Sequence, residues 1–205
     1  MCAIFGTSDR EQFITLYELN KDRGGYASTF CGIKDGKLRV FKSKLFDLDN
    51  VYLEDWDYYL GHHQAPTGKV RKYNENTSHP FNYGRWHVAH NGVLTNYRDI
   101  TESSDTKDID TSYIPAFMEE LDYLPVKWDD KQILEETFSA FKGTHTCWIW
   151  DDKNSIVYLT KNGSTLFSNG TTFSSVQYDG GKPLLDGYVY MMHEGSAFLE
   201  YVKFE

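Results

Sequence analysis

The 205-residue sequence contains no apolar run that approaches the ~20 residues needed to cross a membrane as a helix. Its longest candidates, such as residues 146–150, have the length of a strand. The start, MCAIFGTSDREQF, has neither the basic segment nor the apolar segment of a secretory signal. We therefore expect a soluble, cytoplasmic protein with no membrane partner.

A surplus of basic residues is also missing. Lys and Arg number 21 against 30 Asp and Glu, which gives a formal net charge of -9, and the basic residues are scattered. Binding to a phosphate backbone needs clustered Lys and Arg. The composition therefore argues against nucleic acid as the main partner.

Cysteine is scarce, with Cys2, Cys31 and Cys147 as the full set. An odd number at wide spacing favours neither a disulfide framework nor a zinc site, and no metal or organic cofactor is expected. Cys31 and Cys147 have apolar neighbours in the sequence and are predicted to be buried thiols. Cys2 differs, because a core role is unusual for the second residue of a chain.

Internal repeats, low-complexity segments and Pro- or Gly-rich linkers are absent, so residues 1–205 are predicted to form a single domain. Short strands are expected at 3–5, 38–45 and 85–89, the last ending in a turn at His90-Asn91-Gly92. Apolar spacing predicts helices over 9–20, 110–124 and 131–141. Asp110 or Thr111 is the expected N-cap of the second helix, and Asp129 and Asp130 are placed to cap the third.

The remainder of the chain has the pattern of short strands separated by hairpin turns. The expected strands are 144–151, 155–160, 165–167, 171–176, 188–193 and 197–203. Strands at the start, helices in the middle and a strand meander at the end are typical of an α+β domain with mostly antiparallel sheet.

Four short segments carry residues with catalytic chemistry. They are Met1-Cys2-Ala3-Ile4-Phe5-Gly6, Arg23-Gly24-Gly25-Tyr26, Gly61-His62-His63-Gln64-Ala65-Pro66-Thr67-Gly68, and His79-Pro80-Phe81 followed by Ala89-His90-Asn91-Gly92. Together and in this order, they resemble the glutamine-hydrolysing domain of the class II glutamine amidotransferases, which are N-terminal-nucleophile hydrolases. The resemblance extends from residue 2 to about residue 170. It implies a four-layer αββα sandwich of two antiparallel sheets between helices.

Cys2 is the predicted nucleophile. If Met1 is removed, Cys2 carries both a thiol and a free α-amine, and an α-amine with a pKa of roughly 7.7–8.0 is a usable base near neutral pH. One residue would then supply nucleophile and base together. The alternative is that Met1 stays in place and Cys2 has no catalytic role.

Asn91 and Gly92 match the oxyanion hole of the family, in which a side-chain amide and a backbone N–H stabilise the developing charge. Such a donor is worth roughly 3–4 kcal/mol of barrier. The alternative for this pair is an ordinary Asn-Gly hairpin turn. Asp110 matches the aspartate that binds the α-ammonium of glutamine, and it could equally serve as a helix N-cap.

The remaining candidates for substrate binding rest on the resemblance alone. Thr67 matches a residue of the pocket for the substrate carboxylate. Arg23, followed by Gly24, matches an Arg-Gly pair for which we favour a structural role. His79 is also a candidate. A histidine in a short strand is, however, more often a hydrogen-bonded core group, and this alternative applies to both His79 and His90.

Gln64 departs from the family pattern. The third segment usually reads Gly-His-x-Arg, and the Arg holds the substrate α-carboxylate. Gln64 is neutral and has no guanidinium to form a bidentate pair. An Asp that often follows the Arg-Gly pair is also missing, and Tyr26 stands nearby.

The expected function is hydrolysis of the glutamine side-chain amide through a thioester on Cys2. Class II amidotransferases normally carry an acceptor domain after this one, whereas this sequence stops at Glu205. The resemblance therefore predicts a separate acceptor or synthetase protein that receives the ammonia. Two alternatives stay open: a free-standing hydrolase of another γ-glutamyl or amide compound, and a non-catalytic binding protein with the same fold.

Overall fold

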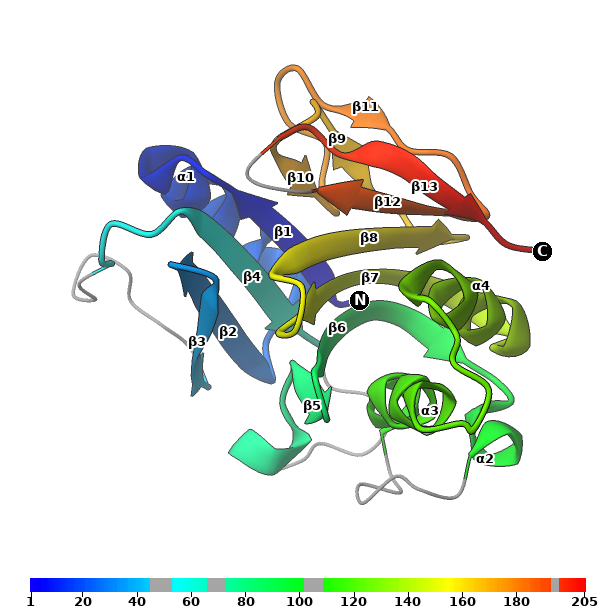
Figure 1. Ribbon diagram of the computed structural model, residues 1–205. Coiled ribbons are helices and arrows are strands. Elements are labelled where there is room, and N and C mark those ends of the chain that lie inside the picture. The colour runs from blue at the N-terminus through cyan, green and yellow to red at the C-terminus, as the bar shows by residue number, and fades with distance from the viewer. Residues whose placement is uncertain (45–52, 66–72, 102–108, 193–195) are drawn as a thin grey trace.

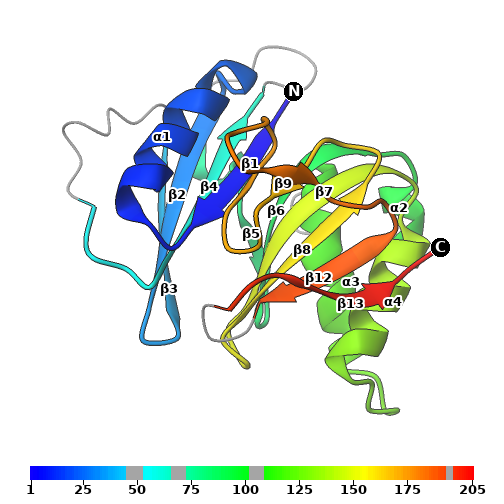
Figure 2. The same ribbon diagram turned by 90° about the horizontal axis from the view of Figure 1, so that it is seen from above.

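Two antiparallel sheets lie face to face between two helical layers in the computed structural model (Figures 1 and 2). The structure describes residues 1–44, 53–65, 73–101, 109–192 and 196–205. Figure 2 shows α1 (Arg10–Asn20) outside one sheet, with α3 (Tyr113–Asp122) and α4 (Asp130–Ala140) outside the other. The α+β sandwich that the resemblance implied is confirmed.

The first sheet has β1 at its centre. Within the described residues its spatial order is β11 (Lys182–Pro183), β9 (Phe167–Ser168), β10 (Phe173–Ser174), β1 (Ala3–Thr7), β4 (Tyr58–Gln64), β2 (Ala27–Lys34) and β3 (Lys37–Ser43). Strand β1 pairs with β4 so that Ala3 lies opposite His63. The residue before Ala3 therefore lies near the end of β4.

The second sheet is a meander. Its spatial order in the part of the chain that is described is β13 (Leu199–Lys203), β12 (Tyr188–Met192), β8 (Ile156–Asn162), β7 (Gly143–Asp151), β6 (Trp86–Leu94) and β5 (Phe81–Tyr83). Adjacent strands pair antiparallel throughout. The strands predicted at 144–151, 155–160 and 197–203 are confirmed within a residue or two, and the one at 188–193 is confirmed up to residue 192.

Alternation along β7 explains how this sheet packs on both faces. Cys147 and Ile149 belong to the cluster under the helices, while Trp148 and Trp150 belong to the cluster between the sheets. Successive residues of a strand point to opposite faces, so one strand supplies both layers. The indole N–H of Trp148 also donates to the carbonyl of Gly61 in the other sheet, at 3.1 Å.

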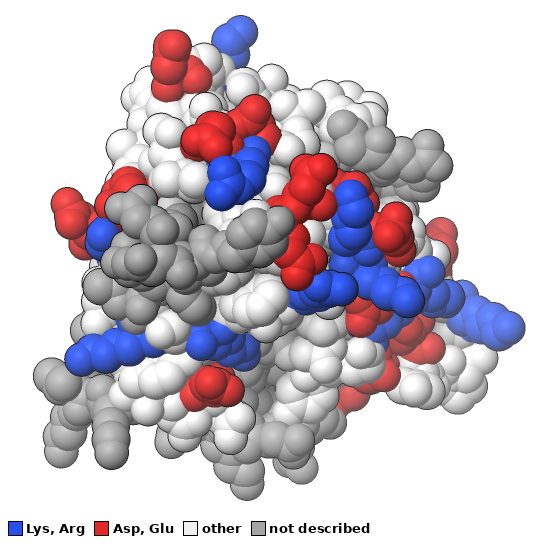
Figure 3. Space-filling view, turned by 90° about the vertical axis from the view of Figure 1, so that its left-hand side faces the viewer, with Lys and Arg blue, Asp and Glu red and all other residues white. Residues whose placement is uncertain are grey.

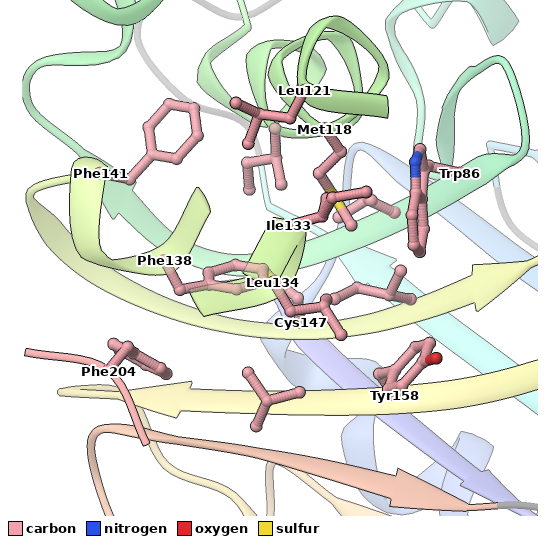
Figure 4. Close-up of a cluster of buried hydrophobic side chains, with 14 of the residues drawn as sticks. Trp86, Met118, Leu121, Ile133, Leu134, Phe138, Phe141, Cys147, Tyr158 and Phe204 are labelled. Atoms are coloured by element: carbon pink, nitrogen blue, oxygen red, sulfur yellow. The ribbon is translucent and has the colours of Figure 1, made fainter. Parts of the chain in front are cut away.

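Helices α3 and α4 cover the outer face of the second sheet (Figure 4). Leu134, Phe138 and Phe141 lie buried against this sheet, as their helical spacing predicts. Asp129 is the N-cap of α4 and forms a capping box with Gln132, which confirms Asp129 as the capping residue. Smaller elements connect these layers: α2 (Tyr97–Ile100) and the 3-10 turns Lys21–Arg23, Glu75–Thr77 and Asp110–Ser112.

On the first sheet, α1 begins at the N-cap Asp9, whose carboxylate accepts from the N–H of Gln12. Phe13, Leu16 and Tyr17 are buried against the sheet. The helix predicted over 9–20 is confirmed. This helix fixes β1 from outside, and β1 in turn presents Cys2 at its start.

The structure corrects the predicted turn at residues 90–92. Strand β6 continues through it to Leu94, and Asn91 lies opposite Thr146 on β7. The Asn-Gly pair is therefore inside a sheet. The N-cap assignment for the helix at 110–124 is also wrong: α3 begins at Tyr113 with Ser112 at the cap position, and no side chain caps it.

Charges of both signs lie beside one another on the face drawn in Figure 3. Among the described residues, no helix is long and apolar enough to cross a membrane.

Candidate active site

Cys2 lies where the central strands of the first sheet meet. Its Sγ accepts a hydrogen bond from the backbone N–H of Ala65, directly after β4, at 3.4 Å. Burial raises the pKa of the Cys2 thiol, while the Ala65 N–H and the positive N-terminus counteract part of that rise. With Met1 in place the thiol is half-buried and its thiolate is disfavoured.

Asn91 is connected to the beginning of β1 through Ser175. The side-chain amide of Asn91 donates to Ser175 Oγ at 3.3 Å, and the same oxygen accepts the N–H of Ile4 at 2.9 Å. Asn91 is buried, and its second amide N–H is free of a partner in the described structure. One donor thus fixes the side chain, and the other is available to a ligand.

Gly92 follows Asn91 in a position that excludes any side chain. A Cβ there would lie 2.0 Å from the carbonyl oxygen of Thr144 on the neighbouring strand. The backbone at Gly92 therefore approaches β7 more closely than another residue would allow. This contact, rather than a hairpin turn, accounts for the glycine.

Asp110 lies in the 3-10 turn that precedes α3. Its Oδ2 accepts the N–H of Leu94 at 2.9 Å, and its Oδ1 accepts the N–H of Thr111 at 2.8 Å. The carboxylate is near enough to Cys2 that its negative charge contributes to raising the thiol pKa. Asp110 thus connects the end of β6 to the helical layer and places an anion near the nucleophile.

Arg23 is the last residue of the 3-10 turn after α1, and its positive charge acts on the Cys2 thiol. Its positive charge lowers the pKa of the Cys2 thiol, though less than burial raises it. The next residue, Gly24, approaches β4 so closely that a Cβ would lie 2.9 Å from the Cβ of His63. The Arg-Gly pair is explained by this contact, since the glycine allows the arginine to lie next to the nucleophile.

Gln64, the residue at the position of the family arginine, is bonded to backbone. Its Nε2 donates to the carbonyl of Thr77 at 3.1 Å, and its Oε1 accepts the N–H of His79 at 3.4 Å. The side chain is buried and supports the segment before β5. Thr67, the other candidate for the carboxylate pocket, lies outside the described residues.

His79 belongs to a buried network under the site. Its Nε2 is 2.8 Å from the hydroxyl of Thr111, and its ring packs against that of His62 at a tilt of 41°, with centroids 4.1 Å apart. Thr111 Oγ1 is also 3.0 Å from Nδ1 of His90. His79 therefore contacts Asp110 only through Thr111, and these contacts are those of a core group.

The proton positions in this network follow from its acceptors. The carbonyl of Thr144 is 3.2 Å from His90 Nε2 and accepts its hydrogen, and the hydroxyl of Thr111 donates to Asp110 Oδ1 at 3.4 Å. Thr111 Oγ1 then accepts from His79 Nε2. Burial lowers the pKa of His62 to about 3 and that of His79 well below its ordinary value, which keeps both rings neutral.

Sequence reasoning missed Ser175 and Ala65 as parts of the site. Ser175, directly after β10 and far away in the sequence, bonds Ile4 and Asn91, and Ala65 bonds Cys2 through its backbone. Neither carries a local signal. Among the residues that the structure describes, no group of His, Cys, Asp or Glu side chains could hold a metal ion.

The chain is similar in sequence to one group of known enzymes and in fold to several solved structures. No family model matches the chain. A curated relative is the glutamine–fructose-6-phosphate aminotransferase (isomerizing) of Oceanobacillus iheyensis, 26% identical over 194 residues. The match covers 87% of this chain and 32% of that enzyme, so the chain spans about a third of its relative.

Solved structures share the fold. The glutamine phosphoribosylpyrophosphate amidotransferase of B. subtilis superposes with a TM-score of 0.70 at 16% identity, over 98% of this chain and 49% of that one. A glutamine aminotransferase class-II domain protein from Silicibacter pomeroyi has a TM-score of 0.58 at 11% identity, over 98% of both chains. A predicted glutamine amidotransferase from Pseudomonas aeruginosa has a TM-score of 0.57 at 14% identity, over 96% of this chain and 94% of that one. The resemblance to class II glutamine amidotransferases is confirmed.

Proposed function

We propose that this chain hydrolyses the side-chain amide of glutamine through a thioester on Cys2, after Met1 has been removed. The observation that carries the proposal is the set of hydrogen bonds at Cys2 and the strand after it: the Cys2 sulfur accepts the Ala65 N–H, and Asn91 is bonded through Ser175 to Ile4 of β1, which directly follows Cys2. Nucleophile and candidate oxyanion donor are thus both linked to β1, one along the chain and the other through Ser175. The glutamine amidotransferase relative supports glutamine as the substrate.

In the proposed reaction, the sulfur of Cys2 attacks the amide carbon and the thiol proton passes to the α-amine. The amine then gives this proton to the leaving nitrogen, the C–N bond breaks, and ammonia departs. Water hydrolyses the thioester to release glutamate. Asn91 Nδ2 and the N–H of Gly92 are proposed to stabilise the oxyanion in both halves of the reaction.

The ammonia is proposed to pass to an acceptor enzyme acting in trans. A nitrogen acceptor is supported by the names of two relatives, since one is a glutamine–fructose-6-phosphate aminotransferase and the other a glutamine phosphoribosylpyrophosphate amidotransferase. Uncoupled ammonia release is wasteful, so we expect low glutaminase activity in the isolated chain and a rise when the acceptor protein is added.

The direct test is intact-mass spectrometry of natively produced protein before and after diazo-oxo-norleucine. We expect the mass of the chain without Met1, one adduct on Cys2, and loss of glutaminase activity in proportion to labelling. Retained Met1 in an active protein, or an adduct elsewhere, would overturn the mechanism. High activity without a partner in pull-down experiments would instead favour a free-standing hydrolase.

A further inference from the structure

Arg23 is a partly buried cation without a counter-ion among the described residues. The structure gives ion pairs to Arg10, Arg39 and Arg85, but to Arg23 it gives no carboxylate within ion-pair distance in the part of the chain described. Burial lowers the pKa of its guanidinium, which shows that the charge is held at a cost. An anion bound there would offset that cost.

The hydrogen bonds of Arg23 leave one edge of the guanidinium available. Nη1 donates to the carbonyl of Ser175 at 2.8 Å and to the hydroxyl of Thr165 at 3.1 Å. Nε is buried and has no hydrogen-bond partner. Nη2 contacts the Sδ of Met1 at 3.7 Å, a weak acceptor.

Nε and Nη2 form the side of the guanidinium that points away from Nη1. Their two N–H groups are parallel, and this edge matches the two oxygens of a carboxylate. The structure therefore presents an anchored guanidinium whose carboxylate-binding edge is covered by the thioether of Met1.

We propose that the Nε–Nη2 edge of Arg23 binds the α-carboxylate of the amino-acid substrate once Met1 has left, a proposal that rests on the proposed glutaminase function. Arg23 would then bind the carboxylate in place of the family arginine, whose position is occupied here by the uncharged Gln64. Gln64 is bonded to Thr77 and His79, so its amide is engaged elsewhere.

The charges around Cys2 match a zwitterion. Arg23 and Asp110 are the side-chain charges that act on the Cys2 thiol, and they have opposite signs. Asp110 is the proposed partner of the α-ammonium. A free α-amino acid would place one charged group on each, whereas a peptide-linked glutamine would satisfy neither.

Removal of Met1 then has two consequences. It frees the α-amine of Cys2, and it uncovers the edge of Arg23 that Met1 Sδ contacts. Processing of the N-terminus would create the base and the carboxylate site in one event.

The test compares glutamine with glutaminamide, its α-carboxamide analogue, using the processed protein. For the wild type we expect kcat/KM to favour glutamine by about 10- to 100-fold, the range of a charge-assisted bidentate contact. In Arg23→Met this preference should fall close to unity, and in Arg23→Lys it should be partly kept, because the charge remains and the fork is lost. The control Thr165→Val removes an Nη1 partner, leaves the free edge intact, and should keep the wild-type preference.

Binding gives a second readout that does not depend on turnover. Calorimetry with Cys2→Ala should detect glutamine binding that is weakened by adding Arg23→Met, while binding of glutaminamide should change little. If kcat/KM and affinity fall equally for glutamine and glutaminamide in Arg23→Met, or if the wild type does not prefer glutamine, then Arg23 does not bind the carboxylate. The glutaminase assignment would still stand in that case. If the wild type turns over neither substrate and diazo-oxo-norleucine fails to label Cys2, the proposed function itself is wrong.

Discussion

Ser175 Oγ lies 3.3 Å from the side-chain nitrogen of Asn91 and 2.9 Å from the backbone nitrogen of Ile4. This one hydroxyl therefore links the candidate oxyanion donor to β1, the strand that directly follows the nucleophile. The link joins the two sheets, because Ile4 is in β1 and Asn91 is in β6.

Asn91→Ala should lower kcat by about 100-fold or more with a smaller change in KM, because an oxyanion donor acts mainly in the transition state. Steady-state kinetics with glutamine would measure it. A change in KM alone would make Asn91 a ground-state contact and remove it from the oxyanion hole.

Ser175→Ala should also lower kcat more than it changes KM, but only by about tenfold in kcat. Asn91 keeps its amide in this variant and loses the hydrogen bond that orients it. The matched control is Ser168→Ala, because Ser168 is a buried serine in β9, the neighbour of β10, and among the described residues its hydroxyl bonds only the backbone of Gly170 and Thr172. Equal losses in both variants would indicate a general structural effect.

Cys2→Ala should abolish glutamine turnover and leave the fold intact, because β1 begins one residue later. Cys2→Ser should be far slower than wild type, since an alkoxide forms much less readily than a thiolate. Circular dichroism and thermal melting would show the fold. Residual turnover in purified Cys2→Ala would contradict the assigned nucleophile.

The local parts of the fold were predictable, and the tertiary parts were not. Helices α1 and α4 are predicted by apolar residues at helical spacing, and each begins at an N-cap aspartate, Asp9 or Asp129. Strands β2 and β4 were missed because nearly every residue in them is buried, so the alternation that marks a half-exposed strand is absent.

The candidate site divides in the same way. Residue type and order identify Cys2, Asn91 and Gly92 as candidates, yet the Asn91-Gly92 dipeptide predicts a turn because it is typical of hairpins. Its place inside β6 follows from pairing with β7, which local sequence does not encode. The partners Ser175 and Ala65 could not be predicted for the same reason.

Arg85→Met should destabilise the fold by about 3 kcal/mol at neutral pH. The guanidinium bonds Asp122, Asp130 and Asp151 at 2.6–2.7 Å, and Asp151 is fully buried. Burial raises the pKa of Asp151, so acid neutralises it readily and the penalty should shrink as the pH falls. Urea unfolding at two pH values would measure this. The control Arg39→Met removes an exposed pair with Glu54 and should cost under about 1 kcal/mol.

The burial of His145 should lower the free energy of unfolding in acid. Burial lowers its pKa from 6.5 to about 3, so between these values the unfolded chain binds a proton that the folded chain does not. The contribution is fully present above pH 6.5 and falls by about 1.4 kcal/mol per pH unit toward pH 3. His145→Phe, which can keep the ring contacts with Phe138 and Phe204, should flatten the pH dependence of unfolding. An unchanged slope would contradict the assignment.

Gln64 supplies the sharpest contrast between a structural and a substrate-binding role. Gln64→Leu keeps the size of the side chain but leaves the Thr77 carbonyl and the His79 N–H without their partners. Unsatisfied buried groups of this kind cost about 1–3 kcal/mol each, so the melting temperature should fall. The preference for glutamine over glutaminamide should nevertheless persist, because Arg23 and not Gln64 is proposed to hold the carboxylate. Thermal melting and the ratio of kcat/KM values for the two substrates would be measured on the same preparation. A lost preference with an unchanged melting temperature would show that Gln64 itself reaches the substrate and would remove the case for Arg23.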